Sequence, residues 1–411
     1  MKLKQLFQRD FTLVVAGQVI SLFGNAILRF ALPLYLLRET GSSALFGVVT
    51  ACSFIPMIVL SLVGGVLADR VNKRNIMVIL DFSTAALIVL FYFMLGEIPL
   101  VPLLIVFLMI LYGISGTYQP AVQASIPVLV DKGSLMQGNA VINLVNTLSG
   151  LLGPVIGGVL FGAWGIFPIL IVSVGCFTAS AIMEIFIHIP FKRQKKGEGV
   201  LAVVRNDLKE SWHFVKNEKP VFLGVVFVLA AFNLVLSSAM IIGLPVMIIN
   251  FLGMSDASLG FSQGAMGLGG LAGGLLAGAV SRKLKPRHGH IILFTCSLIA
   301  VCMGLALLPV FSVSVSYGII TVMIFFEMAA STIFTIQMST IVLQQTPEHL
   351  VGKIMAAIIA VAMCAQPLGQ AFYGFMFDIC GDFPWAVMVG AAVAAVFISI
   401  YSKRTFIKLE E

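Results

Sequence analysis

Twelve long apolar runs follow one another along this 411-residue chain. A helix that crosses a bilayer needs roughly 20 predominantly apolar residues. Only 10% of the residues are charged, whereas a soluble domain carries about a quarter, so the chain needs a bilayer as its solvent. We therefore expect an all-α membrane protein with twelve transmembrane helices, near 11–37, 43–68, 76–95, 100–125, 140–162, 167–190, 221–249, 257–280, 291–309, 313–343, 354–377 and 385–402.

This composition excludes a nucleic-acid binder, a disulfide-stapled secreted module and a disordered chain. The six cysteines are scattered without a CxxC pair, so we interpret them as small hydrophobic residues and expect no metal and no cofactor. The first residues, MKLKQLFQRD, lead into an apolar run without a small-residue cleavage site. They predict a first spanning helix and not a removable signal peptide.

Basic residues predict the orientation, because cytoplasmic loops retain Lys and Arg. Of the 25 Lys and Arg residues, all but Arg29 and Arg38 fall at the N-terminus, at the C-terminus or in loops on one face of the predicted topology. Both termini are therefore expected in the cytoplasm, and the net charge of +7 needs no nucleic-acid partner. A multi-pass protein of a prokaryotic cytoplasmic membrane fits this pattern.

The polar segment 191–220 divides the spans into two halves of six helices, 1–190 and 221–411. Within it an apolar stripe recurs at helical spacing, which predicts an interfacial helix on the inner leaflet. A solvated linker with chance periodicity is the alternative. The stripe consists of Leu201, Val204, Leu208, Trp212 and Val215.

An internal repeat relates the two halves. Leu32-Pro33 corresponds to Leu244-Pro245, and Pro154 corresponds to Pro367, at an offset of 212 to 213 residues. Parallel repeats of this kind are typical of transporters that rock one half against the other.

The loop between the second and third spans reads GGVLADRVNKR over residues 64–74. It resembles the loop motif of the major facilitator superfamily, and the resemblance extends over the whole chain. It implies the major facilitator fold and a cytoplasmic gate of Gly65, Asp69, Arg70 and Arg74. Gly65 permits close helix approach, and Asp69 can pair with Arg70 or face the positive N-terminus of a helix. The alternative is that the basic residues only enforce topology.

Two further segments sharpen the resemblance. GLLGPVIGG at 150–158 is similar to the motif of exporters and antiporters in this superfamily, carried by Gly150, Gly153, Pro154, Gly157 and Gly158. Pro154 bends the helix and the glycines allow tight packing, although ordinary packing of a glycine-rich helix would give the same pattern.

GNAILRFALP at 24–33 resembles the first helix of macrolide-efflux-like drug antiporters, with Asn25 where an acid is usual. Gly270, Gly274 and Gly278 in the eighth span are assigned to packing alone.

Charged residues within the spans are functional candidates, because a buried charge costs several kcal/mol unless it is paired or hydrated. Arg29, Asp81 and Glu327 meet this criterion, and we assign them to proton coupling. Asp81 could instead pair with Arg29 or serve a structural role. Glu184 and His188 are expected to extend toward the surface, with a proton relay as the alternative.

Glu327 is the acid of the second half that lies far from any interface. Burial disfavours its charged form, so the carboxyl can exchange a proton. When ionised it can attract a cationic drug, and competition between drug and proton for one carboxylate is sufficient for antiport. A permanently protonated structural Glu327 is the alternative.

Aromatic, methionine and amide side chains of the spans are expected to line an adaptable cavity. The candidates are Asn25, Phe30, Tyr35, Tyr112, Tyr118, Phe232, Asn233, Met240, Phe326, Gln337 and Gln366.

These features predict a secondary active transporter that exports amphipathic small molecules or drugs, macrolide-like compounds among them, by proton antiport with alternating access. Its expected partners are a small-molecule substrate, protons and membrane lipid, and we expect a monomer. No GxxxxGK[ST] segment is present, so ATP hydrolysis is not predicted, and the chain is not expected to be an enzyme. Proton-coupled uptake of a metabolite and a non-transporting membrane receptor are the alternatives.

Overall fold

The structure is a computed structural model that describes residues 8–190, 206, 209–280, 285–348 and 350–409. Within these residues, twelve helices are long and apolar enough to span a membrane. Helices suit the hydrocarbon interior of a bilayer, because backbone N–H and C=O groups form hydrogen bonds within the segment itself. The prediction of an all-helical protein with twelve spans is confirmed. The apolar stripe of the central segment lies mostly outside the described residues, and Trp212 and Val215 are its described members.

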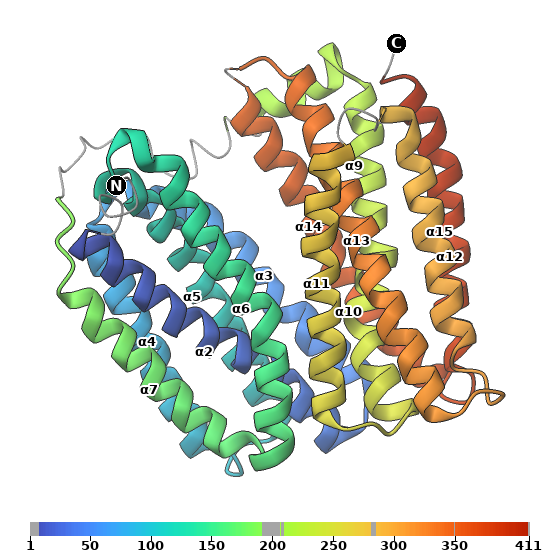
Figure 1. Ribbon diagram of the computed structural model, residues 1–411, viewed down its shortest axis with the longest axis horizontal. Helices are drawn as coiled ribbons and strands as arrows, with labels where there is room; N and C mark the ends of the chain where they lie inside the picture. The colour runs from blue at the N-terminus through green and yellow to red at the C-terminus, as the bar shows by residue number, and fades with distance from the viewer. Residues whose placement is uncertain (1–7, 191–205, 207–208, 281–284, 349, 410–411) are drawn as a thin grey trace. The chain divides into compact units, whose positions relative to one another are not determined.

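The first six spans are α2 (Arg9–Thr40), α3 (Ser43–Arg70), α4 (Lys73–Met94), α5 (Leu100–Leu129), α6 (Leu135–Trp164) and α7 (Ile166–Ile185), with a short 3-10 helix, η1 (Lys132–Ser134), before α6. Helix α4 packs along α7 and also contacts α5 (Figure 1). Phe11, Met77, Val122 and Ile187 belong to a buried apolar cluster where α2 and α4 begin and α5 and α7 end.

The seventh span is interrupted by π-helical turns. It comprises α9 (Val221–Phe232), η3 (Asn233–Ser237), α10 (Ser238–Pro245) and η4 (Val246–Phe251), and another π-turn, η2 (Phe214–Glu218), precedes it. A π-turn adds a residue to the helical repeat and often marks a functional site. At η3 the single hydroxyl hydrogen of Ser238 is shared between Asn233 O at 2.7 Å and Gln366 O at 2.9 Å from Oγ. These bonds fix the irregular turn against the eleventh span.

The remaining spans are α11 (Asp256–Val280), α12 (Gly289–Leu305), preceded by η5 (Pro286–His288), α13 (Val313–Gln345), α14 (Val351–Ile379) and α15 (Pro384–Ile407). Helix α11 packs along α13, and α12 packs along both α13 and α15 (Figure 1). The spans that begin at Arg9, Ser43 and Leu100 have counterparts that begin at Val221, Asp256 and Val313, 212 or 213 residues later. The order of helices thus repeats at the offset seen in the sequence.

Contacts group the described residues into two compact units. The first lies within Met1–Glu39 and Cys52–Val200, and the second lies within Thr40–Ala51 and Leu201–Glu411. Helix α3 therefore contributes its first turns to the second unit. Gly47 of α3 and Gly374 of α14 explain part of this grouping, because a Cβ on Gly47 would lie 2.6 Å from Gln370 O and 2.9 Å from Gly374 Cα.

Asp378 near the end of α14 binds the first turn of α3. Its carboxylate accepts hydrogen bonds from Ser42 Oγ at 2.7 Å, Ser43 N at 2.7 Å and Ala44 N at 3.1 Å. A carboxylate at this position satisfies first-turn N–H groups and complements the positive end of the helix dipole. Asn250 adds a bond from Nδ2 to Gly41 O at 3.1 Å.

Glycines of α11 allow close contact with α13, but on a different face from the predicted one. A Cβ on Gly269 would lie 2.1 Å from Phe325 O, and one on Gly273 would lie 2.4 Å from Ala329 O. A Cβ on Gly270 would make ordinary contacts, and one on Gly274 would meet nothing within 4 Å. Two glycine stripes with the same four-residue spacing run side by side, and spacing alone could not tell which one faces α13.

The contact at Gly273 predicts a strong packing defect. We expect Gly273→Val to lower stability by about 3 kcal/mol or more, because the added carbons force α11 away from the α13 backbone. The unfolding midpoint of the detergent-purified protein measures this effect. Gly274→Val is the matched control. Equal effects of the two substitutions would contradict this packing.

The cap on α3 predicts a second, smaller effect. Asp378→Ala should lower stability by about 1–2 kcal/mol, because first-turn N–H groups of α3 lose their acceptor. Asp382→Ala, at an exposed position four residues later, should leave the unfolding midpoint unchanged. An unaltered midpoint in Asp378→Ala would show that the cap does not contribute.

Candidate functional site

A buried polar cluster lies inside the first unit, between α2, α4, α5 and α7. Its acids are Asp81 of α4, with 3% of its surface exposed, and Glu184 of α7, which is fully buried. Tyr118 of α5 donates its hydroxyl hydrogen to Glu184 Oε1 at 2.6 Å, and both carboxyls act electrostatically on this hydroxyl. Glu184 therefore faces the interior, in contrast to the predicted surface position.

Neutral polar groups complete this cluster. Gln18 of α2 donates from Nε2 to Tyr118 Oη at 2.8 Å, and Ser21, one turn further along α2, lies against the same hydroxyl. Ser180 of α7 interacts with Asp81 and donates to Gly17 O at 3.1 Å. We call this set the Asp81 cluster; it consists of Gln18, Ser21, Asp81, Tyr118, Ser180 and Glu184.

Arg29 is held by an aromatic ring and not by an acid. Its guanidinium carbon lies 3.9 Å from the centre of the Tyr112 ring, a distance at which a cation is attracted to the ring face. Its Nε and Nη2 are buried without a hydrogen-bond partner, and it forms no ion pair with Asp81 within the described part of the chain. Asn25, one turn earlier, donates from Nδ2 to Ser115 Oγ at 3.0 Å.

Glu327 belongs to the second unit and lies in the middle of α13. Its residue surface is 2% exposed. Among the described residues, no N–H or O–H group donates to either carboxyl oxygen. The thiol of the fully buried Cys296 of α12 interacts with the carboxyl. A thiol is a weak donor, so this carboxyl has little compensation for its burial.

The predicted cavity residues fall into both units. In the first, Tyr112 packs its ring 5.4 Å from Phe54, Tyr35 packs 6.4 Å from Phe161, and Phe30 is buried. Tyr118 belongs to the Asp81 cluster, and Asn25 bonds to Ser115.

The second-unit candidates have separate surroundings. Phe232 lies 5.3 Å from Phe334, centre to centre. Asn233 donates to Leu229 O at 3.0 Å, and Gln337 donates to Lys285 O at 2.7 Å. The remaining candidates differ in exposure: Met240 is buried, Phe326 is half exposed and Gln366 is partly buried.

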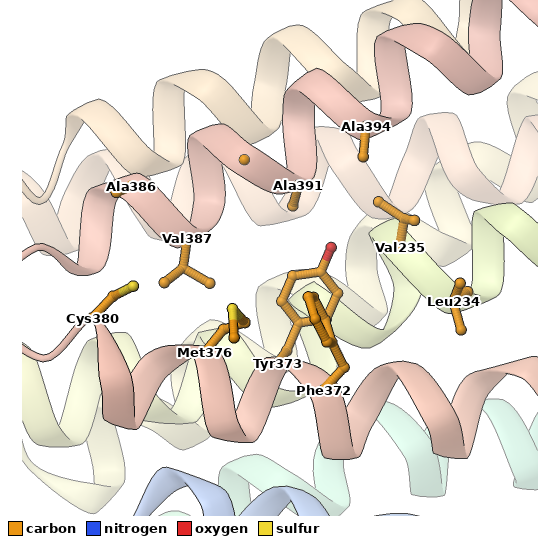
Figure 2. Close-up of a pocket in the computed structure, with 11 residues that line it drawn as sticks. Leu234, Val235, Phe372, Tyr373, Met376, Cys380, Ala386, Val387, Ala391 and Ala394 are labelled. Carbon is orange, nitrogen blue, oxygen red and sulfur yellow. The ribbon is translucent and has the colours of Figure 1, made fainter.

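A different set of residues lines a pocket of about 510 Å³ in the second unit. Figure 2 shows it between α14, α15 and the π-turn η3, with the ring of Tyr373 reaching toward α15. The lining is almost entirely apolar, and none of the predicted cavity residues contributes to it. Its residues are Leu234, Val235, Phe372, Tyr373, Met376, Cys380, Ala386, Val387, Gly390, Ala391 and Ala394.

Another polar residue that the sequence reasoning missed is Gln370 of α14. Its side chain is fully buried, and neither the amide oxygen nor the amide nitrogen has a hydrogen-bond partner among the described residues. On sequence alone, Gln366, one turn earlier, was instead placed among the residues of the predicted cavity. Both are neutral amides in one apolar span, so their types gave no basis for choosing between them.

The predicted gate lies where α3 ends and α4 begins. Gly64 contacts α5, because a Cβ there would lie 2.8 Å from Thr117 Cα, whereas a Cβ on Gly65 would meet nothing within 4 Å. Arg70 is exposed, and Arg74 has a buried Nε without a hydrogen-bond partner. The side chain of Asp69 lies outside the described part of the structure.

The glycine motif of α6 contacts α2. A Cβ on Gly153 would lie 2.3 Å from Ala26 Cβ, and one on Gly157 would lie 3.0 Å from Phe30 Cδ1. Gly150 has open space around it, and Gly158 is buried. Pro154 lies inside the helix, so the motif brings α6 against the segment of α2 that carries Asn25 and Arg29.

Comparison with curated proteins gives exporters as relatives. The chain is 25% identical over 399 residues to macrolide efflux protein A of Streptococcus pyogenes, covering 94% of each protein. It is 24% identical over 367 residues to the enterobactin exporter EntS of Citrobacter koseri, covering 89% of this chain and 84% of the exporter.

Solved structures share the fold at low identity. A bacterial homologue of the human lysosomal transporter Spinster, in an inward-facing and unoccupied conformation, superposes with a TM-score of 0.72 at 14% identity and covers 97% of both chains. The nucleoside transporter NupG gives a TM-score of 0.73 at 10% identity, covering 97% of this chain and 99% of that one.

The sequence model of the Major Facilitator Superfamily matches residues 14–370. With the twelve spans and the exporter relatives, this match identifies a multi-pass membrane transporter and not an enzyme. The chain belongs to the Major Facilitator Superfamily.

Proposed function

We propose that this transporter exports amphipathic small molecules, macrolide-like drugs among them, in exchange for protons. The two exporter relatives cover most of the chain and support the direction of transport. An orientation with both termini in the cytoplasm of a prokaryote agrees with the loop distribution of Lys and Arg. We propose that the transporter acts as a monomer.

The observation that carries the proposal is the isolation of Glu327. A carboxylate buried in an apolar span without a compensating donor is unfavourable, whereas the protonated form is tolerated. A cationic or hydrogen-bonding cargo can stabilise the ionised form in place of the proton. Proton and cargo therefore compete for the same carboxyl, and each transport cycle exchanges one for the other.

Arg29 is proposed to provide a fixed positive charge in the first unit. Its contact with Tyr112 holds the guanidinium without neutralising it, because the aromatic ring carries no net charge. An arginine held in this way can respond to the charge of a cargo or of a nearby carboxyl. Asp81 is assigned to proton coupling together with Arg29 and Glu327.

Aromatic and amide side chains are proposed to contact the cargo during the transport cycle. Within the first unit these are Tyr112, Asn25 and Tyr35. Within the second they include Phe326 and Gln366. Aromatic surface suits an apolar body, and amide groups supply orientation through hydrogen bonds, so an amphipathic compound matches this set better than a sugar or an ion.

Alternating access requires contacts that break on opening. We assign that role on the cytoplasmic side to Gly65, Asp69, Arg70 and Arg74, with rocking between the halves 1–190 and 221–411. The close packing of Gly153 and Gly157 on α2 is proposed to keep this part of the first unit dry, which limits proton leak during exchange.

Glu327→Gln tests the proposal directly. Inside-out membrane vesicles with an acidic interior should take up a cationic dye and a labelled macrolide, and a protonophore should abolish the uptake. Glu327→Gln should reduce gradient-driven uptake by about tenfold or more, because the amide cannot exchange a proton. Glu97→Gln, an exposed loop substitution, is the matched control.

Two results would contradict this assignment. Uptake that is unchanged in Glu327→Gln would remove Glu327 from the mechanism. Cargo that leaves the vesicles when their interior is acidified would reverse the proposed direction and indicate symport.

The Arg29–Tyr112 contact gives a separate prediction. Tyr112→Leu should lower stability by about 2 kcal/mol, because a partly desolvated guanidinium loses its aromatic partner. Tyr112→Phe keeps the ring and should stay within about 0.5 kcal/mol of the unsubstituted protein. Thermal unfolding in detergent provides the measurement, and equal losses in the two variants would show that the hydroxyl and not the ring matters.

A further inference from the structure

We propose that the apolar pocket between α14, α15 and the π-turn η3 binds one acyl chain of a membrane glycerolipid, whose ester carbonyl accepts a hydrogen bond from Tyr373. The pocket lies in the second unit. It shares no residue with the groups assigned to cargo or to proton coupling. The inference therefore does not depend on the proposed function.

Tyr373 carries the strongest hydrogen-bonding group of the pocket lining. The residue is 4% exposed, and no hydrogen bond joins its hydroxyl to another of the described residues. The hydroxyl points across the pocket toward α15 (Figure 2). A buried tyrosine hydroxyl usually has a partner, and leaving it unsatisfied costs free energy. A ligand that brings an acceptor oxygen into the pocket removes this cost.

The pocket has a buried floor and an exposed mouth. Val387 and Ala391 of α15 are buried at the floor. At the mouth, Leu234, Phe372 and Gly390 are exposed, one from each of the three walls. All three are apolar, so contact with hydrocarbon is more favourable at this opening than contact with water.

The mouth continues into an apolar surface of α14. The exposed residues of this surface recur at helical spacing, and each is more than half exposed. They are Leu368, Phe372, Phe375 and Ile379. The charged residues of α14, Lys353 and Asp378, lie near its two ends. An uncharged exposed stripe of this kind matches the hydrocarbon core of a bilayer, so the pocket opens toward lipid.

Small residues of α15 give the pocket its width. Ala386, Gly390 and Ala394 follow one another at four-residue spacing, which often permits close contact between helices. Helix α15 packs mainly along α12, however, and a Cβ on Gly390 would meet nothing within 4 Å. These small residues therefore border the pocket instead of a neighbouring helix.

The wall formed by η3 is held by contacts within the protein. Leu234 and Val235 line the pocket from this π-turn. A Cβ on Gly369 would lie 2.1 Å from Leu234 O, so the backbone of α14 closely approaches the turn. Ser238 Oγ also lies 2.7 Å from Asn233 O. A wall that is already fixed loses little conformational freedom when a ligand binds.

The pocket has the depth of one leaflet. Its lining extends from Phe372 to Cys380 on α14 and from Ala386 to Ala394 on α15, which is about 12 Å along each helix. Half of the hydrocarbon core measures about 15 Å. Both lining segments lie on the side of the connection between α14 and α15, which is the outer leaflet in the proposed orientation.

Tyr373 lies at the depth of the ester groups of a glycerolipid. Helix α14 has 29 residues and a length of about 43 Å, so it extends about 7 Å beyond each side of the hydrocarbon core. Tyr373 precedes the end of α14 at Ile379 by about 9 Å. Its hydroxyl is therefore close to the hydrocarbon boundary, where the ester carbonyl of an acyl chain can accept its hydrogen.

Other classes of ligand fit the pocket less well. Its lining contains no charged residue, so an ion or a charged headgroup would have no partner inside it. The volume of about 510 Å³ is large enough for a small molecule. An exported compound, however, would have to leave again for the residues assigned to cargo. A chain from the surrounding bilayer needs no such route.

The first test compares ester and ether lipids bound to the purified full-length protein. Native mass spectrometry measures the binding of dioleoyl phosphatidylcholine and of its dialkyl ether analogue, which lacks the carbonyl groups. The ester lipid should bind about three- to tenfold more tightly, because it adds a hydrogen bond with Tyr373. Tyr373→Phe keeps the ring and should bind both lipids equally. Equal binding by the unsubstituted protein, or a difference that persists in Tyr373→Phe, overturns the inference.

The second test locates the chain in a membrane. Vesicles of dioleoyl phosphatidylcholine that contain the protein receive a trace of the same lipid with a photoreactive diazirine on one acyl chain. Irradiation should label the buried residues Tyr373, Val387 and Ala391. Gly390→Phe adds a ring to the pocket and should reduce this labelling about fivefold or more. Gly318→Phe is the matched control, because a Cβ on Gly318 also meets nothing within 4 Å.

The labelling also separates a lipid from the exported compound. An excess of macrolide should leave the labelling of the buried residues unchanged. Labelling that macrolide removes would identify a cargo site, and labelling confined to exposed residues would place the lipid outside the pocket. Either result overturns the inference. The comparison of ester and ether lipids still tests it if Gly390→Phe fails to fold, and a failure of drug uptake would count against the proposed function alone.

Discussion

The free-energy cost of an unsatisfied polar group in hydrocarbon is the constraint on which this structure depends. It requires helical backbone in every span and allows few intramembrane charges. Each such charge is handled in a different way. Arg29 lies on an aromatic ring, Asp81 and Glu184 share a cluster of hydroxyl and amide groups, and Glu327 has a thiol beside it. Of these groups, Glu327 has the least compensation, because neither of its carboxyl oxygens accepts a hydrogen bond from an N–H or O–H group of the described residues.

The fold could be predicted because its determinants are local and one-dimensional. Span length, apolar content and the order of helices are all present in the sequence. Corresponding helices of the two halves begin 212 or 213 residues apart, which agrees with the repeat seen in the sequence. The contact face of α11 could not be predicted, since glycines at 269 and 273 and those at 270 and 274 have identical spacing. The π-turn at Asn233–Ser237 also escaped prediction, because Ser238 and the α14 backbone stabilise it through a tertiary contact.

The candidate sites were predicted in part, for a related reason. Asp81 and Glu327 stand out because an acid far from a span end is rare. Glu184 lies one residue before α7 ends, so its distance from the interface gave no signal. Its surroundings include Tyr118 of α5 and Gly17 of α2, and sequence spacing does not reveal such contacts between helices. Gln18 and Ser21 are neutral residues of common types, and only their convergence on Tyr118 distinguishes them.

The two units repeat in helix order but not in charge. At an offset of 213 residues, Asp81 corresponds to Phe294, and Glu327 corresponds to Ile114. Neither ionisable group has a counterpart, so symmetry cannot have required them, and each must serve its own unit. On the proposed assignments, Arg29 supplies a fixed positive charge in the first unit, and Glu327 of the second unit exchanges proton and cargo. Helix α3 contributes residues to both units and therefore connects them covalently.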